Sequence, residues 1–249
     1  MTKKIQSPWA SGSGEILKHA LELLKEDTDT KRRLAMISVD NAVELMMKTY
    51  LGLPARVTGL KITRKEFQEF SESFPKLLDA LEKHASDKLD GIDLGEIEWY
   101  HRLRNELYHQ GNGLTVERDK VEVYAELANV LFENLFGFRL VEPENSSAEM
   151  LGNFMASWVE LEKSLMTLAS LVYESGSKRP LLPLNATRLL HNLRIISRSE
   201  MEEIEHLRMI RNKVVHGEDD SKSLLTNDLI KKLRELTVEL NKKAQNSRQ

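Results

Sequence analysis

The sequence predicts an all-α protein made of two tandem antiparallel helical bundles. Apolar residues recur at three- and four-residue steps along most of the chain, and no segment alternates with the period of two that a half-buried strand shows. A polar stretch separates two halves of similar order. With 249 residues the chain is long enough for two domains of roughly 100–150 residues each.

The first half is predicted to be helical after a Ser-Gly-Ser-Gly start at 11–14. Gly52 and Pro54 end the second helix, and residues 52–63 are expected to form a loop with a short extended piece at 60–63. The predicted helices cover 16–24, 31–51, 67–89 (as one or two helices), 94–108 and 116–135.

The second half is predicted to begin after a linker at 139–149, which contains Pro, Asn and Ser between two apolar blocks. The linker divides the chain into an N-terminal domain at 1–138 and a C-terminal domain at 150–249. The predicted helices cover 149–174, 184–197, 199–215 and 226–243, with a loop at 175–183.

The order of features is the same in both halves: a long apolar helix, a loop, shorter helices, an Arg-Asn-x-x-x-His motif, a glycine and a closing helix. A Val-Glu-Leu triplet lies in each long helix, at 43–45 and 159–161. These correspondences predict an internal duplication.

The two motifs are the candidate site. The first reads Arg104-Asn105-Glu106-Leu107-Tyr108-His109, and the second reads Arg211-Asn212-Lys213-Val214-Val215-His216. Glycine follows each histidine at once or after one residue, which predicts that each motif ends a helix. RNA cleavage requires that the 2′-hydroxyl lose a proton, that the 5′-oxygen gain one and that charge on phosphorus be stabilised. Two histidines can share the proton transfers, and arginine can bind the phosphate.

Both motifs resemble the active-site signature of the HEPN superfamily (higher eukaryotes and prokaryotes nucleotide-binding domain). In that signature four to six residues separate an Arg from a His, and a polar residue, often Asn, comes directly after the Arg. The resemblance implies small helical bundles and a metal-independent endoribonuclease of a toxin–antitoxin, abortive-infection or CRISPR-type antiviral defence system. Two motifs would then meet within one chain or across a homodimer. The implied catalytic residues are Arg104, Asn105, His109, Arg211, Asn212 and His216, with Glu44, Glu160 and Tyr108 in support. The order of acid and base stays open. The implied partners are an RNA substrate and an antitoxin or regulatory protein, without a cofactor.

Three other interpretations of the motif residues compete with a ribonuclease site. A HEPN-like module could bind RNA, nucleotide or a protein without chemistry, and the motif residues could simply cap helices. The pairs Glu106/His109 and Glu203/His206 have the spacing of di-iron ligands, but the counterpart of Glu106 is a lysine. Aromatic residues near the first motif could stack a base, although we favour a place in the core between the two modules. They are Trp99, Tyr100 and Tyr108.

The amino-acid composition excludes several classes of site and of function. The chain has no cysteine, so disulfides, thiolate metal sites and cysteine nucleophiles are excluded. A net charge of −3 argues against a protein that coats nucleic acid, although residues 178–216 carry eight Lys and Arg against four acids. The N-terminus lacks the pattern of a secretory signal, and no apolar run reaches the length of a membrane span. We therefore expect a cytoplasmic protein.

Overall fold

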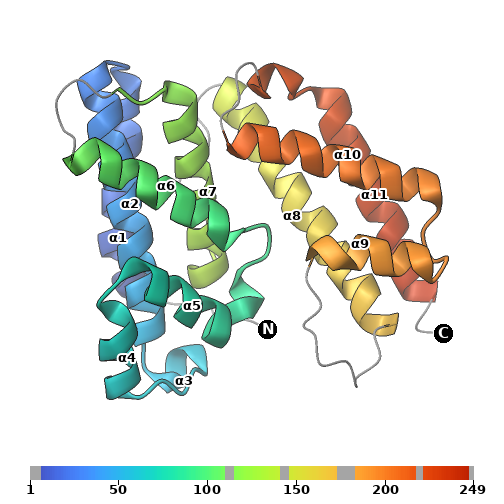
Figure 1. The fold of residues 1–249 in the computed structure, drawn as a ribbon, viewed down its shortest axis with the longest axis horizontal. Helices are drawn as coiled ribbons and strands as arrows, with labels where there is room; N and C mark the ends of the chain where they lie inside the picture. The colour runs from blue at the N-terminus through green and yellow to red at the C-terminus, as the bar shows by residue number, and fades with distance from the viewer. Residues whose placement is uncertain (1–6, 110–114, 141–145, 173–182, 217–220, 247–249) are drawn as a thin grey trace. The chain divides into compact units, whose positions relative to one another are not determined.

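The computed structural model describes residues 7–109, 115–140, 146–172, 183–216 and 221–246. Within these ranges it contains eleven α-helices, two short 3₁₀ turns and no strand, which confirms the predicted all-α class (Figure 1). The chain divides into two compact units, Met1–Pro143 and Glu144–Gln249, called unit 1 and unit 2 below. The division falls inside the predicted linker, whereas the internal duplication stays a prediction.

Unit 1 is built on three long helices, α1, α2 and α7, with α2 packed against both of the others. Methionine, leucine and phenylalanine side chains fill its core, and the largest fully buried ones include Leu17, Met36, Met46, Phe132 and Phe136. Helices α5 and α6 also pack on α2. The helices are α1 (Ser7–Lys25), α2 (Asp29–Gly52), α3 (Ala55–Thr58), α4 (Arg64–Ser71), α5 (Phe74–Ala85), α6 (Leu94–His109) and α7 (Arg118–Phe136).

Two local predictions for unit 1 are wrong. Helix α1 runs straight through the Ser-Gly-Ser-Gly segment, because Gly14 lies against the core: a Cβ atom there would come within 3.0 Å of Leu140 Cδ1. The predicted loop at 52–63 contains a short helix, α3, at Ala55–Thr58. Residues 60–63 are neither helix nor strand, and Thr63 has an extended backbone (φ −77°, ψ 157°). Thr63 caps α4, accepting a hydrogen bond from the backbone of Glu66, whose carboxylate in turn accepts from the Thr63 backbone.

Unit 2 packs α8 against α11 along its length, with α9 and α10 beside them. Helix α8 begins three residues before the predicted end of the linker, and α9 ends five residues earlier than predicted because Arg194 adopts a left-handed conformation (φ 58°). The predicted loop at 175–183 lies, up to its last residue, outside the described residues. The helices are α8 (Ser146–Val172), α9 (Pro183–Asn192), α10 (Arg198–Val215) and α11 (Asn227–Asn246).

The start of α10 is tied to the end of α11 by one ion pair. Ser197 and Glu200 form a capping box, and Lys243 Nζ lies 2.6 Å from Glu200 Oε1. Lys243 also donates to the carbonyl of Ile195 at 3.1 Å. Burial would raise the pKa of the Glu200 carboxyl, but the hydrogen bonds from Lys243 and Ser197 outweigh burial and hold the pKa below its ordinary value of 4.5.

We therefore expect Glu200→Gln to destabilise unit 2 by roughly 1 kcal/mol near neutral pH. A carboxyl whose pKa is lowered by folding stabilises the fold above its unfolded pKa, and the stabilisation is lost as the pH falls through the folded pKa. The melting temperatures of the wild type and the variant should therefore converge as the pH is lowered below 4.5. A difference that stays constant down to acid pH would contradict this role of the charge.

No helix in the described part of the chain is both long enough and apolar enough to cross a membrane.

Candidate active site

The first motif occupies the last turns of α6. Residues three and four apart share one face of a helix, so His101, Arg104, Asn105 and Tyr108 form a continuous stripe. His109 is the last residue of the helix, and its side chain is exposed. Helix α6 packs on α2 and α7, and these two helices supply the residues that hold the stripe.

The buried carboxylate of Asp40, on α2, contacts two residues of this stripe. Asp40 is fully buried, and its Oδ2 lies 3.0 Å from His101 Nδ1 and 3.2 Å from Arg104 Nε. The Tyr124 hydroxyl, on α7, donates to Asp40 Oδ1 at 2.9 Å. Three helices therefore meet at one carboxylate, and its charge is balanced and hydrogen-bonded as a buried charge must be.

Aromatic rings enclose the Asp40 cluster. The His101 imidazole stacks on Phe74 with ring centroids 3.7 Å apart and an angle of 3° between the planes. Tyr124 stacks on the fully buried Tyr100 at 4.5 Å. Burial, together with the neighbouring Asp40, raises the pKa of the Tyr124 hydroxyl well above its ordinary value, so Tyr124 remains a hydrogen-bond donor.

The Arg104 side chain is fixed on all sides of its guanidinium. One Nη atom donates to Asn41 Oδ1 at 2.7 Å, the other donates to Asn105 Oδ1 at 2.9 Å, and Nε makes the ion-pair contact with Asp40 without the alignment of a hydrogen bond. A guanidinium has five N–H groups, so each Nη retains one for a further acceptor. The side chain is 19% exposed, which leaves it open to such an acceptor.

Tyr108 is the exposed end of the stripe. Its side chain lies under the Arg104 guanidinium, with the Arg104 Cζ atom 5.5 Å from the ring centroid, and its ring meets that of His109 edge to face at 5.3 Å. The residue is 61% exposed. Tyr108 is therefore not in a core, Tyr100 is buried within unit 1 and Trp99 is half-buried, while a core between the two modules stays a prediction.

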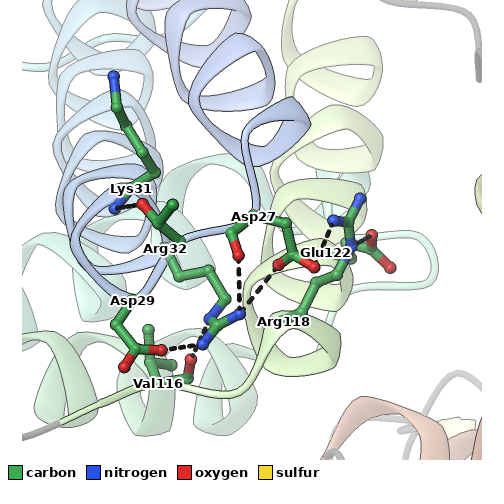
Figure 2. A network of polar contacts seen from close by, with 8 residues as sticks. Asp27, Asp29, Lys31, Arg32, Val116, Arg118 and Glu122 are labelled. Atoms are coloured by element: carbon green, nitrogen blue, oxygen red, sulfur yellow. Dashed lines mark hydrogen bonds and ion pairs between the residues drawn. The ribbon is translucent and has the colours of Figure 1, made fainter.

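Hydrogen bonds and ion pairs hold the segment that leads into α7 after the first motif. Arg32 Nε donates to the carbonyl of Val116 at 3.0 Å, and the same guanidinium binds the carboxylates of Asp27 and Asp29 (Figure 2). Asp27 also binds Arg118, at 3.1 Å. This network joins the α1–α2 turn to the segment that leads into α7. The glycines predicted to end the motif helix, Gly111 and Gly113, lie outside the described residues.

The second motif lies at the end of α10, as the sequence predicts, but its arginine has different surroundings. Arg211 is buried, with 4% of the residue exposed, whereas Asn212 and His216 are exposed. His216 ends the helix in a right-handed conformation, and its backbone N–H donates to the carbonyl of Asn212 at 2.9 Å. The following Gly217 lies outside the described residues.

One turn before Arg211, Arg208 lies over the buried ring of Trp158, with 5.9 Å from its Cζ atom to the centroid. It also donates to Thr187 Oγ1 at 3.3 Å. Burial lowers the pKa of the Arg208 guanidinium below its ordinary value, although nearby carboxylates oppose this.

Neither of the two glutamates predicted to support the arginines forms a hydrogen bond or ion pair with an arginine in the described part of the chain. Glu44 binds Lys48, one turn further along α2, at 2.6 Å, and Glu160 is exposed and lies 3.6 Å from Lys163. The carboxylate that meets Arg104 is Asp40, one turn before Glu44. The sequence offers one indication of this role: Asp40 is an acidic residue within the apolar stripe of α2, beside Val39. A buried carboxylate without a partner would destabilise the fold there, so a partner is to be expected.

The described parts of the chain contain no group of three or more His, Cys, Asp and Glu side chains that could hold a metal ion. A cleft of about 400 Å³ lies between α4 and α5, and none of the predicted site residues lines it. Each motif is described within its own unit, and the composite site that would combine them stays a prediction.

Comparison of the chain with family models, with curated proteins and with solved structures gave no match. The resemblance to the HEPN superfamily therefore rests on the motifs alone.

Proposed function

We propose that this protein is a metal-independent endoribonuclease of a prokaryotic defence or toxin–antitoxin type system. The observation that supports the proposal best is the arrangement of the first motif. Arg104 is held rigid on a buried carboxylate with N–H groups to spare, while His109 is exposed at the end of the same helix. Phosphate binding followed by proton transfer requires a fixed cation and an accessible imidazole, and the end of this helix supplies both.

In the proposed reaction the 2′-oxygen of the RNA attacks the adjacent phosphorus, and one histidine accepts the 2′-hydroxyl proton. The bond from phosphorus to the 5′-oxygen breaks, and a second histidine gives that oxygen a proton. The products end in a 2′,3′-cyclic phosphate and a 5′-hydroxyl. Arg104 and Arg211 would bind the charged phosphate, and His109 and His216 would transfer the protons in an order left open.

A second candidate is a HEPN-like module that binds RNA, nucleotide or a regulatory protein without cleaving anything. The burial of Arg211 favours this alternative for unit 2, because a guanidinium with 4% of its residue exposed must move before it can touch a phosphate. The same observation does not weigh against unit 1, where Arg104 retains access to solvent.

The test is cleavage of mixed single-stranded RNA and total tRNA by the full chain in the presence of EDTA. We expect the wild type to cleave and the double variant His109→Ala/His216→Ala to be slower by about 10²–10⁴-fold, the usual contribution of acid–base groups. The control is His19→Ala, since His19 is an exposed histidine on α1.

Equal cleavage by the wild type and the double variant would contradict the assignment of these histidines. Cleavage that EDTA abolishes would contradict a metal-independent reaction. If the wild type binds RNA and does not cleave it, the binding module is the better description.

A further inference from the structure

His101 has the surroundings of an acid–base group, although it lies outside both motifs. Its Nδ1 faces the two oxygens of Asp40 at 3.1 and 3.0 Å, and its ring is pressed flat against Phe74. No hydrogen bond of Nε2 occurs with any residue in the described part of the chain, and the side chain is 15% exposed. A carboxylate beside Nδ1 keeps the proton of a neutral imidazole on that atom, which leaves the Nε2 lone pair as a proton acceptor.

His101 also lies close to Arg104, the residue proposed to bind the phosphate. The two residues are one helical turn apart on the same face of α6, with a rise of about 4.5 Å between them, and Asp40 contacts both. His109 lies beyond Arg104 on the same helix, with a rise of about 7.5 Å. Along the helix axis the backbone position of Arg104 therefore lies between those of the two histidines, and His109 is rotated from Arg104 by about 140° around the axis.

We propose that His101, oriented by Asp40, is a further catalytic residue of unit 1 and acts as the general base toward a phosphodiester held by Arg104. The inference rests on the proposed ribonuclease function, but it moves the role of base from one of the two motif histidines to His101 and leaves only the role of acid to a motif histidine. In the step assigned to it, His101 Nε2 takes the proton of the 2′-hydroxyl as the 2′-oxygen bonds to phosphorus. The proton given to the departing 5′-oxygen comes from an exposed histidine at a helix end. Asp40 touches no reacting atom and is a positioning residue.

His101→Asn separates catalysis from structure. The amide nitrogen of asparagine is the same number of bonds from Cα as Nδ1 of histidine, so the variant can still donate to Asp40 and leave Arg104 in place. It lacks any counterpart of Nε2. The matched control is His19→Asn, the same change at an exposed position of α1.

We expect His101→Asn to reduce kcat by about 10²-fold or more with little change in KM, since the lost group acts on the proton in flight. The low-pH limb of the pH–rate profile should flatten, because that limb reports protonation of the base. His19→Asn should match the wild type. If His101→Asn keeps activity within about threefold of the wild type while the wild type cleaves RNA, the inference fails and the proposed function stands.

A second measurement does not depend on turnover. In the full chain with isotope-labelled histidine, uridine 3′-monophosphate should shift the ring resonances of His101, and Arg104→Ala should abolish the shift. If the wild type cleaves no RNA, the proposed function fails on that result alone. His101 is then judged by this titration: an Arg104-dependent shift supports its contact with phosphate, and the absence of a shift at saturating nucleotide overturns it.

Discussion

Replacing Asp40 with alanine is expected to destabilise unit 1 by about 3 kcal/mol, which is the low end of the range for breaking a buried ion pair. The carboxylate is fully buried and binds His101, Arg104 and Tyr124. Its removal leaves the Tyr124 hydroxyl inside the core without an acceptor, and an unsatisfied buried donor is destabilising in itself. We place the effect at the low end because Arg104 and His101 keep part of their solvent access.

The measurement is urea unfolding followed by circular dichroism, with amide hydrogen exchange to locate the change in α2, α6 and α7. The control on the same helix is Glu44→Ala, which loses only a partly exposed pair with Lys48 and should change stability by less than about 1 kcal/mol. Asp40→Asn keeps oxygen and volume but not charge, so its effect should fall between the two. An Asp40→Ala variant as stable as Glu44→Ala would show that the cluster does not hold the three helices together.

Activity should respond to Asp40 more strongly than stability alone explains. Arg104 loses the contact that fixes Nε, and His101 loses the acceptor that sets its tautomer. In the proposed reaction an arginine that can move would no longer pre-orient the phosphate, and preorganisation accounts for much of electrostatic catalysis. Cleavage by folded Asp40→Ala, measured well below its melting temperature, should therefore fall by at least about 10²-fold.

Helix positions were predictable because the apolar stripes are long and regular. In α10 the predicted start is one residue after the observed one, and the predicted end coincides with the observed end. The start is recognisable from the capping residues Ser197 and Glu200, and the end from Val214 and Val215, where the apolar stripe stops. In α1 the same method was wrong. Gly12 and Gly14 are usually signs of a turn, but the helix continues through both, and at Gly14 it lies so close to Leu140 that a Cβ would come within 3.0 Å of it. Tertiary packing here outweighs helix propensity.

The residues of the candidate site were only partly predictable. The motif gives Arg104 and His109 because their spacing and the glycine after them are local features. Asp40 is more than sixty residues away, and only the packing of α6 across α2 brings the two together. The resemblance instead indicates Glu44, yet that glutamate is one turn further along α2 than Asp40 and binds Lys48.

The burial of the two arginines shows a further limit of local patterns. Both motifs begin with Arg-Asn and end with His at the end of a helix, but Arg104 is half-buried and Arg211 is buried. Burial depends on which side chains of other helices surround the guanidinium, and these are not encoded in the motif. Two motifs that share the Arg-Asn-x-x-x-His pattern can therefore differ in how far their arginines are exposed.

Trp158→Ala is expected to have the largest effect in unit 2, about 4 kcal/mol, as is usual when a buried aromatic ring is deleted from a core. Trp158 is 1% exposed on α8, and α8 makes the main contact with α11. Unfolding of unit 2 should be followed by hydrogen exchange of α8 and α11. The control is Met209→Ala, since Met209 is 48% exposed on α10 and should change stability by less than about 1 kcal/mol. Similar losses in both variants would contradict the central place of Trp158.

The same substitution connects the core of unit 2 to its motif. The Arg208 guanidinium lies over the Trp158 ring, and Arg208 is one turn from Arg211 on α10. Removing the ring takes away the surface on which the Arg208 guanidinium lies, so amide protection should fall around Arg208 and Arg211 before it falls at the capped start of the helix. Trp158→Phe should restore most of the protection, because a phenyl ring refills most of the cavity and still offers a face to the guanidinium. If Trp158→Phe loosens α10 as much as Trp158→Ala does, the motif is held by contacts other than this ring.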